Sequence, residues 1–273
     1  QNTAMPAKQT NPLALNPNNL DLAHVATYER RVKASLARVW ENVRDWEHLP
    51  HLHDSSFDYC ELDEADDWGW RVWSDPDHVS FFELVIDADR YVVRTFVDGA
   101  QVSEIWTHLK ERGDSTDVRV EFHAAGTTAD NRDEAGQLYL AVYDTLWTED
   151  ETMMCERQRR LDQRRERSDE VTLGPIEELA STLPHRFELQ GREYLLTRAG
   201  ADWVATPTIC PHMLGPLEAA ADPGQLRCPW HGYVFDLVSG QCLSPPGARC
   251  KLGPPPTLSE TGGQLLARSG RAR

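Results

Sequence analysis

Two short stretches with matching residue types decide the fold of the C-terminal part of this 273-residue chain. Residues 210–217 read CPHMLGPL, and residues 228–232 read CPWHG. Their metal-ligating side chains are Cys210, His212, Cys228 and His231. Such a set can hold a tetrahedral zinc ion, or a [2Fe–2S] cluster with two thiolates on one iron and two imidazoles on the other. Zinc sites typically pair cysteine with cysteine and histidine with histidine along the chain. Here each stretch supplies one of each, which favours the cluster.

The longer stretches 210–217 and 228–241 (CPWHGYVFDLVSGQ) resemble the two cluster-binding loops of Rieske iron–sulfur domains. The resemblance covers about residues 171–268 and implies an all-β domain that binds a [2Fe–2S] cluster. It assigns one iron to the two cysteines and the other to the two histidines, that is, to Cys210 with Cys228 and to His212 with His231. Neither loop carries the additional disulfide cysteine of the respiratory-complex subgroup, so the domain is similar to the ferredoxin and oxygenase type.

A second pattern lies near the N-terminus, where residues 41–53 read ENVRDWEHLPHLH. A non-haem iron(II) centre uses two imidazoles and one carboxylate, and leaves its other positions open for oxygen. Asp45 and His48 are three residues apart and would share one face of a helix. Pro50 interrupts that helix, so the turn after it can bring His53 back towards His48. His51 competes with His53 as the partner of His48.

This segment resembles the catalytic motif of Rieske non-haem iron oxygenases, which reads E-N-x-x-D-x-x-H-x-x-x-x-H. The five specified positions are present as Glu41, Asn42, Asp45, His48 and His53. The resemblance implies that His48 and His53 bind a mononuclear Fe(II). It also implies that Asp45 bridges an iron-binding and a cluster-binding histidine and carries electrons between the two centres.

By the same resemblance, the third iron ligand is a carboxylate on a later helix of the same domain. The segment 148–152 reads TEDET and is similar to the acidic site of that helix. Asp150 is the expected ligand, because aspartate is usual in the family. Glu151 fits the spacing to Glu156 and Gln158 at least as well, so the choice between the two acids stays open.

The rest of the N-terminal sequence predicts a strand at 27–33, then a helix from 36 to about 48 capped by Ser35. The acidic segment 54–67 is expected to be a solvated loop. Short alternating runs separated by turn signals then predict an antiparallel meander, with strands at 68–74, 79–87, 91–97, 101–109 and 118–124.

From Asn131 to about residue 170 the pattern becomes helical, with a second helical segment starting at Thr148 if Thr148 and Glu151 form a capping box. This order of strand, helix, meander and long helix resembles the helix-grip fold of START-like domains, in which a sheet wraps a long helix around an apolar cavity. The predicted fold class is therefore α+β, with a START-like domain followed by an all-β Rieske domain.

The predicted organisation is a flexible lead-in at 1–20, a START-like catalytic domain at 21–168 and a Rieske domain at 169–273. This reverses the usual order of the family, in which the Rieske domain comes first. In the family, electrons cross between neighbouring subunits of a head-to-tail trimer. The short linker here permits transfer either within a chain or between chains, in a homotrimer or another homo-oligomer.

Composition excludes several other classes of protein. The chain has 44 acidic and 28 basic side chains and a net charge of −16, which disfavours nucleic-acid binding. It lacks a run of 18 apolar residues, so no membrane span is expected. The first 22 residues lack the apolar region of a signal peptide, and four of the six cysteines gather in the C-terminal part. Both observations predict a cytoplasmic protein.

Both resemblances together predict the oxygenase component of a multi-component system that hydroxylates or oxidatively demethylates an apolar small molecule with O₂. The chain lacks a G-x-G-x-x-G nucleotide loop, so NAD(P)H is expected to supply electrons through a separate reductase or ferredoxin. The alternative is a non-enzymatic electron-transfer or redox-sensing Rieske ferredoxin, fused to a START-like domain that binds a hydrophobic ligand. In that case His48 and His53 would bind no metal.

Overall fold

The computed structural model describes residues 22–163 and 168–270. The predicted lead-in at 1–20 lies outside these residues. The chain divides into two compact units, with the boundary after Gln158. Throughout the described residues, each helix is too short or too polar to cross a lipid bilayer.

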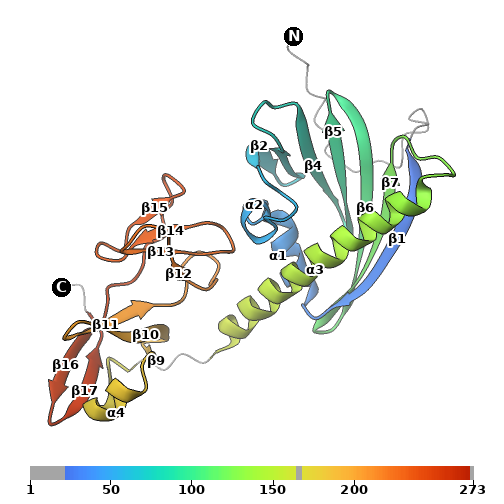
Figure 1. Ribbon diagram of the computed structural model, residues 1–273. Helices are drawn as coiled ribbons and strands as arrows, with labels where there is room; N and C mark the ends of the chain where they lie inside the picture. The colour runs from blue at the N-terminus through green and yellow to red at the C-terminus, as the bar shows by residue number, and fades with distance from the viewer. Residues whose placement is uncertain (1–21, 164–167, 271–273) are drawn as a thin grey trace. The chain divides into compact units, whose positions relative to one another are not determined.

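Within residues 22–163 the strands are β1 (Ala23–Val32), β2 (Glu61–Asp66), β3 (Gly69–Trp73), β4 (Ser80–Asp87), β5 (Arg90–Val97), β6 (Ala100–Arg112) and β7 (Ser115–Ala124). They form one antiparallel sheet in the order β1-β7-β6-β5-β4-β3-β2. The strands from β2 to β7 follow one another as a meander, and β1 closes the order by pairing with β7 (Figure 1).

Three helices accompany this sheet: α1 (Leu36–Arg44), α2 (Leu49–Leu52) and α3 (Arg132–Asp162). The side chain of Ser35 caps α1 as predicted, because its hydroxyl accepts a hydrogen bond from the Arg38 backbone N–H. The long helix α3 runs across one face of the sheet (Figure 1). This arrangement of meander and crossing helix confirms the predicted helix-grip architecture and the α+β fold class.

Three local predictions were wrong. The acidic segment 54–67 is not all loop, because β2 pairs with β3 at the edge of the sheet, where acidic side chains can stay in solvent. The first helix ends at Arg44 rather than near His48. The long helix is continuous through Thr148, whose hydroxyl donates to the Asp144 carbonyl within the helix instead of capping a new one.

The alternation of side chains along the strands gives the sheet one apolar face towards α3. Trp70, Leu84 and Ile105 lie on that face and belong to the main core cluster. Trp147 and Met154 of α3 pack into the same cluster. The sheet and the helix therefore share one core, and the two surfaces diverge enough to leave a cavity between them.

The opposite face of the sheet carries a row of buried charges. Arg71, Glu83, Arg94 and Glu104 are cross-strand neighbours on β3, β4, β5 and β6. Each is only 2–3% exposed. Arg71 Nη2 lies 2.5 Å from Glu83 Oε2, and Arg94 Nε lies 3.0 Å from Glu104 Oε2. Alternating signs in register let each charge pair with its neighbours, which offsets the cost of taking it out of water.

We expect Glu83→Ala to lower the free energy of unfolding by about 3–5 kcal/mol, because it leaves Arg71 and Arg94 buried without the carboxylate between them. Urea unfolding of the full chain, followed by circular dichroism, measures this. Glu111→Ala removes an exposed glutamate from the same sheet and is the matched control. Equal stability of the two variants would contradict a paired row.

Within residues 168–270 the second unit contains one short helix, α4 (Ile176–Ser181), and ten strands. They are β8 (Glu170–Pro175), β9 (His185–Leu189), β10 (Arg192–Ala199), β11 (Asp202–Pro207), β12 (Glu218–Ala219), β13 (Gln225–Arg227), β14 (Val234–Asp236), β15 (Cys242–Ser244), β16 (Thr257–Thr261) and β17 (Gln264–Arg268), with β8 the first along the chain.

These strands form three small antiparallel sheets, ordered β11-β10-β9, β12-β13-β14-β15 and β16-β17-β8. Leu196 and Leu265 are fully buried in the core that β8, β9, β10 and β17 share with α4. The predicted all-β domain is confirmed, with α4 as a single added turn-and-a-half of helix. The predicted cluster ligands lie in two loops, one before β12 and one between β13 and β14 of the four-stranded sheet.

Candidate metal centres

The two cysteine–histidine loops of the second unit close in the same way. In the first loop, the Cys210 N–H donates to the Gly215 carbonyl, and the Leu214 N–H donates to the Cys210 carbonyl. In the second, the Cys228 N–H donates to the Tyr233 carbonyl, and the Gly232 N–H donates to the Cys228 carbonyl. The offsets are five and four residues in both loops.

The fourth residue after each cysteine must therefore take the same backbone conformation. Leu214 has φ +62° and Gly232 has φ +65°, both in the left-handed region. Glycine reaches this region without strain, whereas a side chain pays for it. The first loop accepts that cost at Leu214, which is consistent with a loop shape imposed by a function rather than by local preference.

The four predicted ligands converge. Cys210 and Cys228 are each 1% exposed, and the rings of His212 and His231 lie with their centroids 4.7 Å apart at 80°. A hydrogen bond with Cys210, together with the nearby His231, lowers the pKa of Cys228 to about 5. The same thiol–thiol contact and burial raise the pKa of Cys210. Two thiols and two imidazoles held together at the ends of two loops fit a [2Fe–2S] cluster.

Gly215 leaves the space that this donor set needs. A Cβ at this position would lie 2.7 Å from Cys228 Sγ and 2.8 Å from the Trp230 ring. Side-chain atoms do not approach this closely, so any larger residue would push the second loop away from the first. The glycine is thus required by packing, and not by its own backbone angles.

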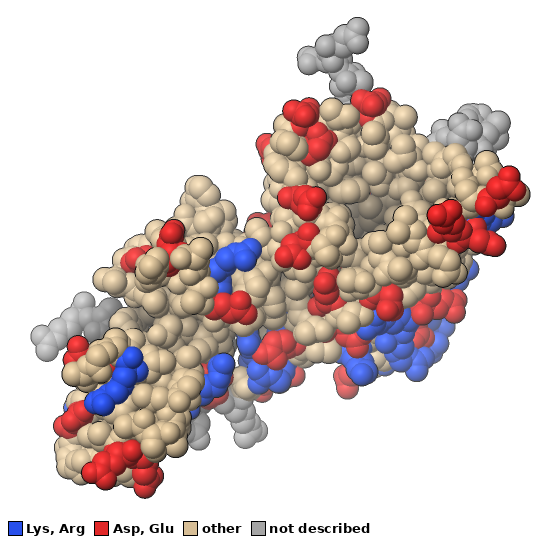
Figure 2. Space-filling view, in the orientation of Figure 1, with Lys and Arg blue, Asp and Glu red and all other residues tan. Residues whose placement is uncertain are grey.

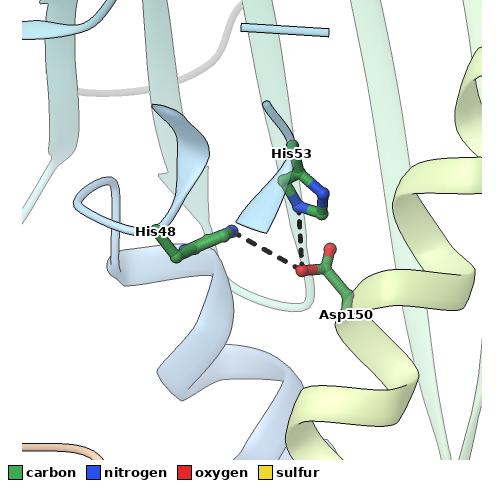
Figure 3. A group of neighbouring side chains, drawn as sticks. All are labelled: His48, His53 and Asp150. Atoms are coloured by element: carbon green, nitrogen blue, oxygen red, sulfur yellow. Dashed lines mark hydrogen bonds and ion pairs between the residues drawn. The ribbon is translucent and has the colours of Figure 1, made fainter. Parts of the chain in front are cut away.

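The predicted ligands of the first unit also meet. His53 Nε2 lies 3.0 Å and His48 Nε2 lies 3.5 Å from the same oxygen of Asp150, Oδ1. Figure 3 shows both imidazoles pointing at this carboxylate, His48 from the left of the view and His53 from above. The three ligand atoms lie within 4.8 Å of one another, and His48 and His53 are 4% and 1% exposed. Two imidazoles and one carboxylate gathered on one side fit a non-haem iron(II) centre.

The backbone route to this arrangement differs from the predicted one. Asp45 does not share a helix with His48, because it is the extended C-cap of α1, with φ −95° and ψ 94°. His48 instead precedes α2, and His53 follows it. Pro50 lies in the first turn of this short helix, where proline is tolerated. One turn of helix between the two histidines brings their rings to a centroid distance of 5.1 Å.

The neighbouring acids Asp150 and Glu151 point in different directions. Successive residues of a helix are rotated by about 100°, so when Asp150 faces the histidines, Glu151 faces β1. There its carboxylate lies 2.6 Å from Arg30 Nη2 and accepts a hydrogen bond from the Lys33 backbone N–H. Of the two acids that the sequence left open, Asp150 is the one brought to His48 and His53, and Glu151 is not.

Two polar neighbours hold the ligand set in place. Asn42 Nδ2 donates to Asp150 Oδ1 at 2.9 Å, and Glu149 Oε2 lies 2.7 Å from His53 Nδ1. Burial opposes a charge on His53, but Asp150 and Glu149 outweigh it and raise the pKa of His53. Burial also works against the Asp150 carboxylate, yet His53, His48 and Asn42 hold the pKa of Asp150 below its usual range. The sequence motif contained Asn42 but gave no sign of Glu149.

The remaining motif positions have local partners. Asp45 Oδ2 lies 3.8 Å from His48 Nδ1. Glu41 binds the guanidinium of Arg157 on α3 through both carboxylate oxygens, at 2.6 and 2.8 Å. Although its partial burial would raise the pKa, Arg157 and Arg38 hold the pKa of Glu41 below its usual range. Glu41 therefore joins α1 to α3. His51 is not among the residues that converge.

The three ligands lie in the wall of the cavity between the sheet and α3. The cavity has a volume of about 290 Å³ and is lined mainly by apolar and aromatic side chains. Trp70, Phe82 and Tyr91 come from the sheet, and Tyr143 and Trp147 come from α3. Figure 2 shows the first unit hollowed between these two surfaces. A small apolar molecule in this cavity would lie beside the three ligands.

Known proteins match each part of the chain separately. Residues 169–258 match the family described as Rieske [2Fe-2S] domain. Pheophorbide a oxygenase, chloroplastic, from Oryza sativa subsp. japonica is 35% identical over 77 residues, which are 27% of this chain and 14% of that protein. Apoptosis-inducing factor 3 from Mus musculus is 30% identical over 79 residues, 29% of this chain and 13% of that protein. The chain thus spans only a small part of these relatives.

The C-terminal unit therefore carries a Rieske [2Fe-2S] domain. The two matched proteins have different names, and only one of them is named an oxygenase. A solved START superfamily protein from Mycobacterium smegmatis covers 48% of this chain and 99% of its own length, with a TM-score of 0.37 and 15% identity. The helix-grip description of the first unit rests on its own strand order and crossing helix.

Gly215→Ala is expected to abolish cluster binding, because the added methyl group would occupy the space of Cys228 Sγ and Trp230. Acid-labile sulfide and the visible absorption of the purified chain measure the cluster. Gly247→Ala is the control, since its Cβ would meet open space and only backbone strain at φ +82° is added. A Gly215→Ala protein with full sulfide content would show that the loops do not pack this closely around the cluster.

Proposed function

We propose that this chain is the oxygenase component of a Rieske-type system, which oxidises a small apolar molecule at a mononuclear Fe(II) with O₂. The observation that carries the proposal is the convergence of His48, His53 and Asp150 on one wall of an apolar cavity, in a chain that also carries a Rieske domain. The match to pheophorbide a oxygenase agrees with it. The reaction is hydroxylation or oxidative demethylation of the molecule in the cavity.

His48, His53 and Asp150 would hold the mononuclear iron, and Cys210, Cys228, His212 and His231 would hold the cluster. When bound, the iron activates O₂, and the cluster delivers electrons one at a time. The chain's own part is to fix the ligands and to keep the site dry. Glu149 accepts the Nδ1 hydrogen of His53, which leaves Nε2 free to face Asp150. Asn42 orients the Asp150 carboxylate by donating to the oxygen that faces the histidines.

Asp45 has a positioning role in this proposal. Its carboxylate lies beside His48 Nδ1 and orients that imidazole, while its other oxygen accepts the Glu47 backbone N–H. We assign to Asp45 the link between the iron-binding histidine and a cluster-binding histidine, from the same chain or from a neighbouring one. NAD(P)H acts through a separate reductase or ferredoxin, and the working assembly is a homo-oligomer. The cytoplasmic location stays a prediction.

The alternative is an electron-transfer or redox-sensing protein in which the cavity only binds a hydrophobic ligand. The apolar lining fits this function as well as it fits an oxygenase. The two functions differ in the metal content of the first unit, because only the oxygenase needs iron there.

Anaerobically purified protein, reconstituted with Fe(II), is expected to hold about three iron atoms and two sulfides per chain. Asp150→Ala should reduce iron to about two per chain without loss of sulfide, since it removes a ligand of the mononuclear site only. Iron and sulfide assays measure both. Glu151→Ala is the matched control and should keep all three, because Glu151 pairs with Arg30. Two irons in the unmodified chain would favour the alternative.

Asp45→Ala is expected to abolish oxygen consumption driven by a reductase, while the absorption spectrum and the iron content stay unchanged. The physical reason is that the variant keeps all seven metal ligands and removes only the group beside His48 Nδ1. Glu47→Ala removes a carboxylate two residues away and serves as the control. Normal oxygen consumption by the Asp45 variant would remove its role between the centres.

A further inference from the structure

The cavity of the first unit has a second polar site, at a distance from the metal ligands. Thr95 on β5 and Ser103 on β6 are directly opposed in the sheet, and both line the cavity. Ser103 Oγ donates to Thr95 Oγ1 at 2.8 Å. Tyr139 of α3 lines the same cavity, with its hydroxyl group near that of Ser103. These three hydroxyl groups, called the hydroxyl trio below, form a row across the gap between sheet and helix.

The hydroxyl trio is held rigidly. Ser103 is 4% exposed, and the Tyr139 ring stacks on Phe122 with a centroid distance of 5.0 Å. Other hydroxyl groups line the cavity at Tyr91, Tyr143 and Ser56, and of these Ser56 is exposed. A polar group in an apolar cavity costs free energy unless it is hydrogen-bonded. A ligand or a water molecule that hydrogen-bonds to these three hydroxyl groups would remove that cost.

The number of hydrogens shows what the hydroxyl trio offers. Three hydroxyl groups own three hydrogens, and the hydrogen bond from Ser103 to Thr95 uses one of them. A hydrogen bond between Tyr139 and Ser103 would use at most one more. One hydrogen is therefore available to a ligand in the cavity, which calls for an acceptor oxygen on that ligand.

The charges around the cavity select against ions. Among the described lining residues, carboxyl and imidazole groups occur only at the metal site, as Asp45, His48, His53 and Asp150, and the lining has no lysine or arginine. An anion or cation placed at the hydroxyl trio would be desolvated without a partner of opposite charge, which is costly. In Figure 2 acidic side chains surround the hollow, while basic ones gather on the lower edge of this unit. A neutral ligand fits, and an anionic one does not.

The helix sets the length of such a ligand. Tyr139 and Asp150 lie on the same side of α3, because eleven residues make about three full turns, and they are about 16 Å apart along the helix axis. Allowing about 3 Å at each end for the contacts to the hydroxyl trio and to the metal site leaves about 10 Å. This is the length of two fused or linked aromatic rings with one substituent.

We propose that the hydroxyl trio is the anchoring subsite for the substrate, a neutral two- or three-ring apolar molecule that carries a carbonyl or similar acceptor oxygen at the end remote from the oxidised carbon. The trio binds that oxygen, the aromatic walls hold the rings, and the far end of the molecule lies beside His48, His53 and Asp150. This inference rests on the proposed function only in calling the ligand a substrate. The binding preference itself requires no iron.

Three probes of nearly equal shape test the subsite by equilibrium dialysis against the full chain: 2-acetylnaphthalene, 2-isopropylnaphthalene and 2-naphthoate. The neutral ketone is expected to bind about fivefold more tightly than the hydrocarbon, because one hydrogen bond to the trio is gained. The carboxylate is expected to bind at least about tenfold more weakly than the ketone, because its charge is desolvated. Equal affinity of ketone and hydrocarbon, or tightest binding of naphthoate, would overturn the proposal.

Substitutions in the cavity lining show which side chains cause the preference for the ketone over the hydrocarbon. Thr95→Val combined with Ser103→Ala should reduce the ketone-to-hydrocarbon ratio to about one, while leaving hydrocarbon affinity within about twofold. Thr95→Ser keeps the hydroxyl group and should retain the ratio. Ser56→Ala removes a hydroxyl group elsewhere on the cavity lining and is the matched control. A double variant with an unchanged ratio would place the anchoring group elsewhere, and the ratio in the unmodified chain remains a test if that variant does not fold.

The two proposals fail separately. A chain that binds a third iron but shows no preference for the ketone keeps the oxygenase function and loses the hydroxyl trio as its anchoring subsite. A chain that prefers the ketone but holds two irons has the subsite in a binding module, and the ligand is then not a substrate.

Discussion

The rotational setting of α3 about its own axis is the constraint on which the first unit depends. Two adjacent acids on this helix have partners in different directions. Glu151 reaches Arg30 on β1, and Asp150 reaches the two histidines. Both contacts form at a single rotation of the helix. The pair between Glu41 and Arg157, almost two turns further along α3, fixes the same rotation from α1. These contacts hold α3 against both β1 and α1.

The same rotation decides what lines the cavity. Residues at three- and four-residue intervals from Asp150 towards the N-terminus include Trp147, Tyr143 and Tyr139, and all of them face the sheet. Metal ligands and cavity walls are therefore properties of one helix face, and neither can be changed in orientation without the other. The buried row from Arg71 to Glu104 stiffens the sheet on the opposite side, so the cavity is formed between two firm surfaces.

The sequence predicted those features whose cause is local. The ligands of the second unit lie within two loops, so their spacing alone indicates how they converge. The first unit is harder, since Asp150 and His53 are 97 residues apart and their meeting depends on a helix rotation that no short pattern encodes. Asn42 and Asp150 are separated by 108 residues, so the motif contained the partner without indicating the contact. The edge strand β2 was not predicted, because its acidic residues leave no clear alternation of apolar and polar side chains in the sequence.

The two loops of the Rieske domain close on backbone hydrogen bonds that use none of the ligand atoms. Loop shape and ligand chemistry are thus separable properties of the same residues. Exchange of a ligand side chain is therefore expected to leave the closing hydrogen bonds of each loop in place. Such modularity makes the loops suitable for redesign towards a different metal, with Cys210, His212, Cys228 and His231 as the positions to vary.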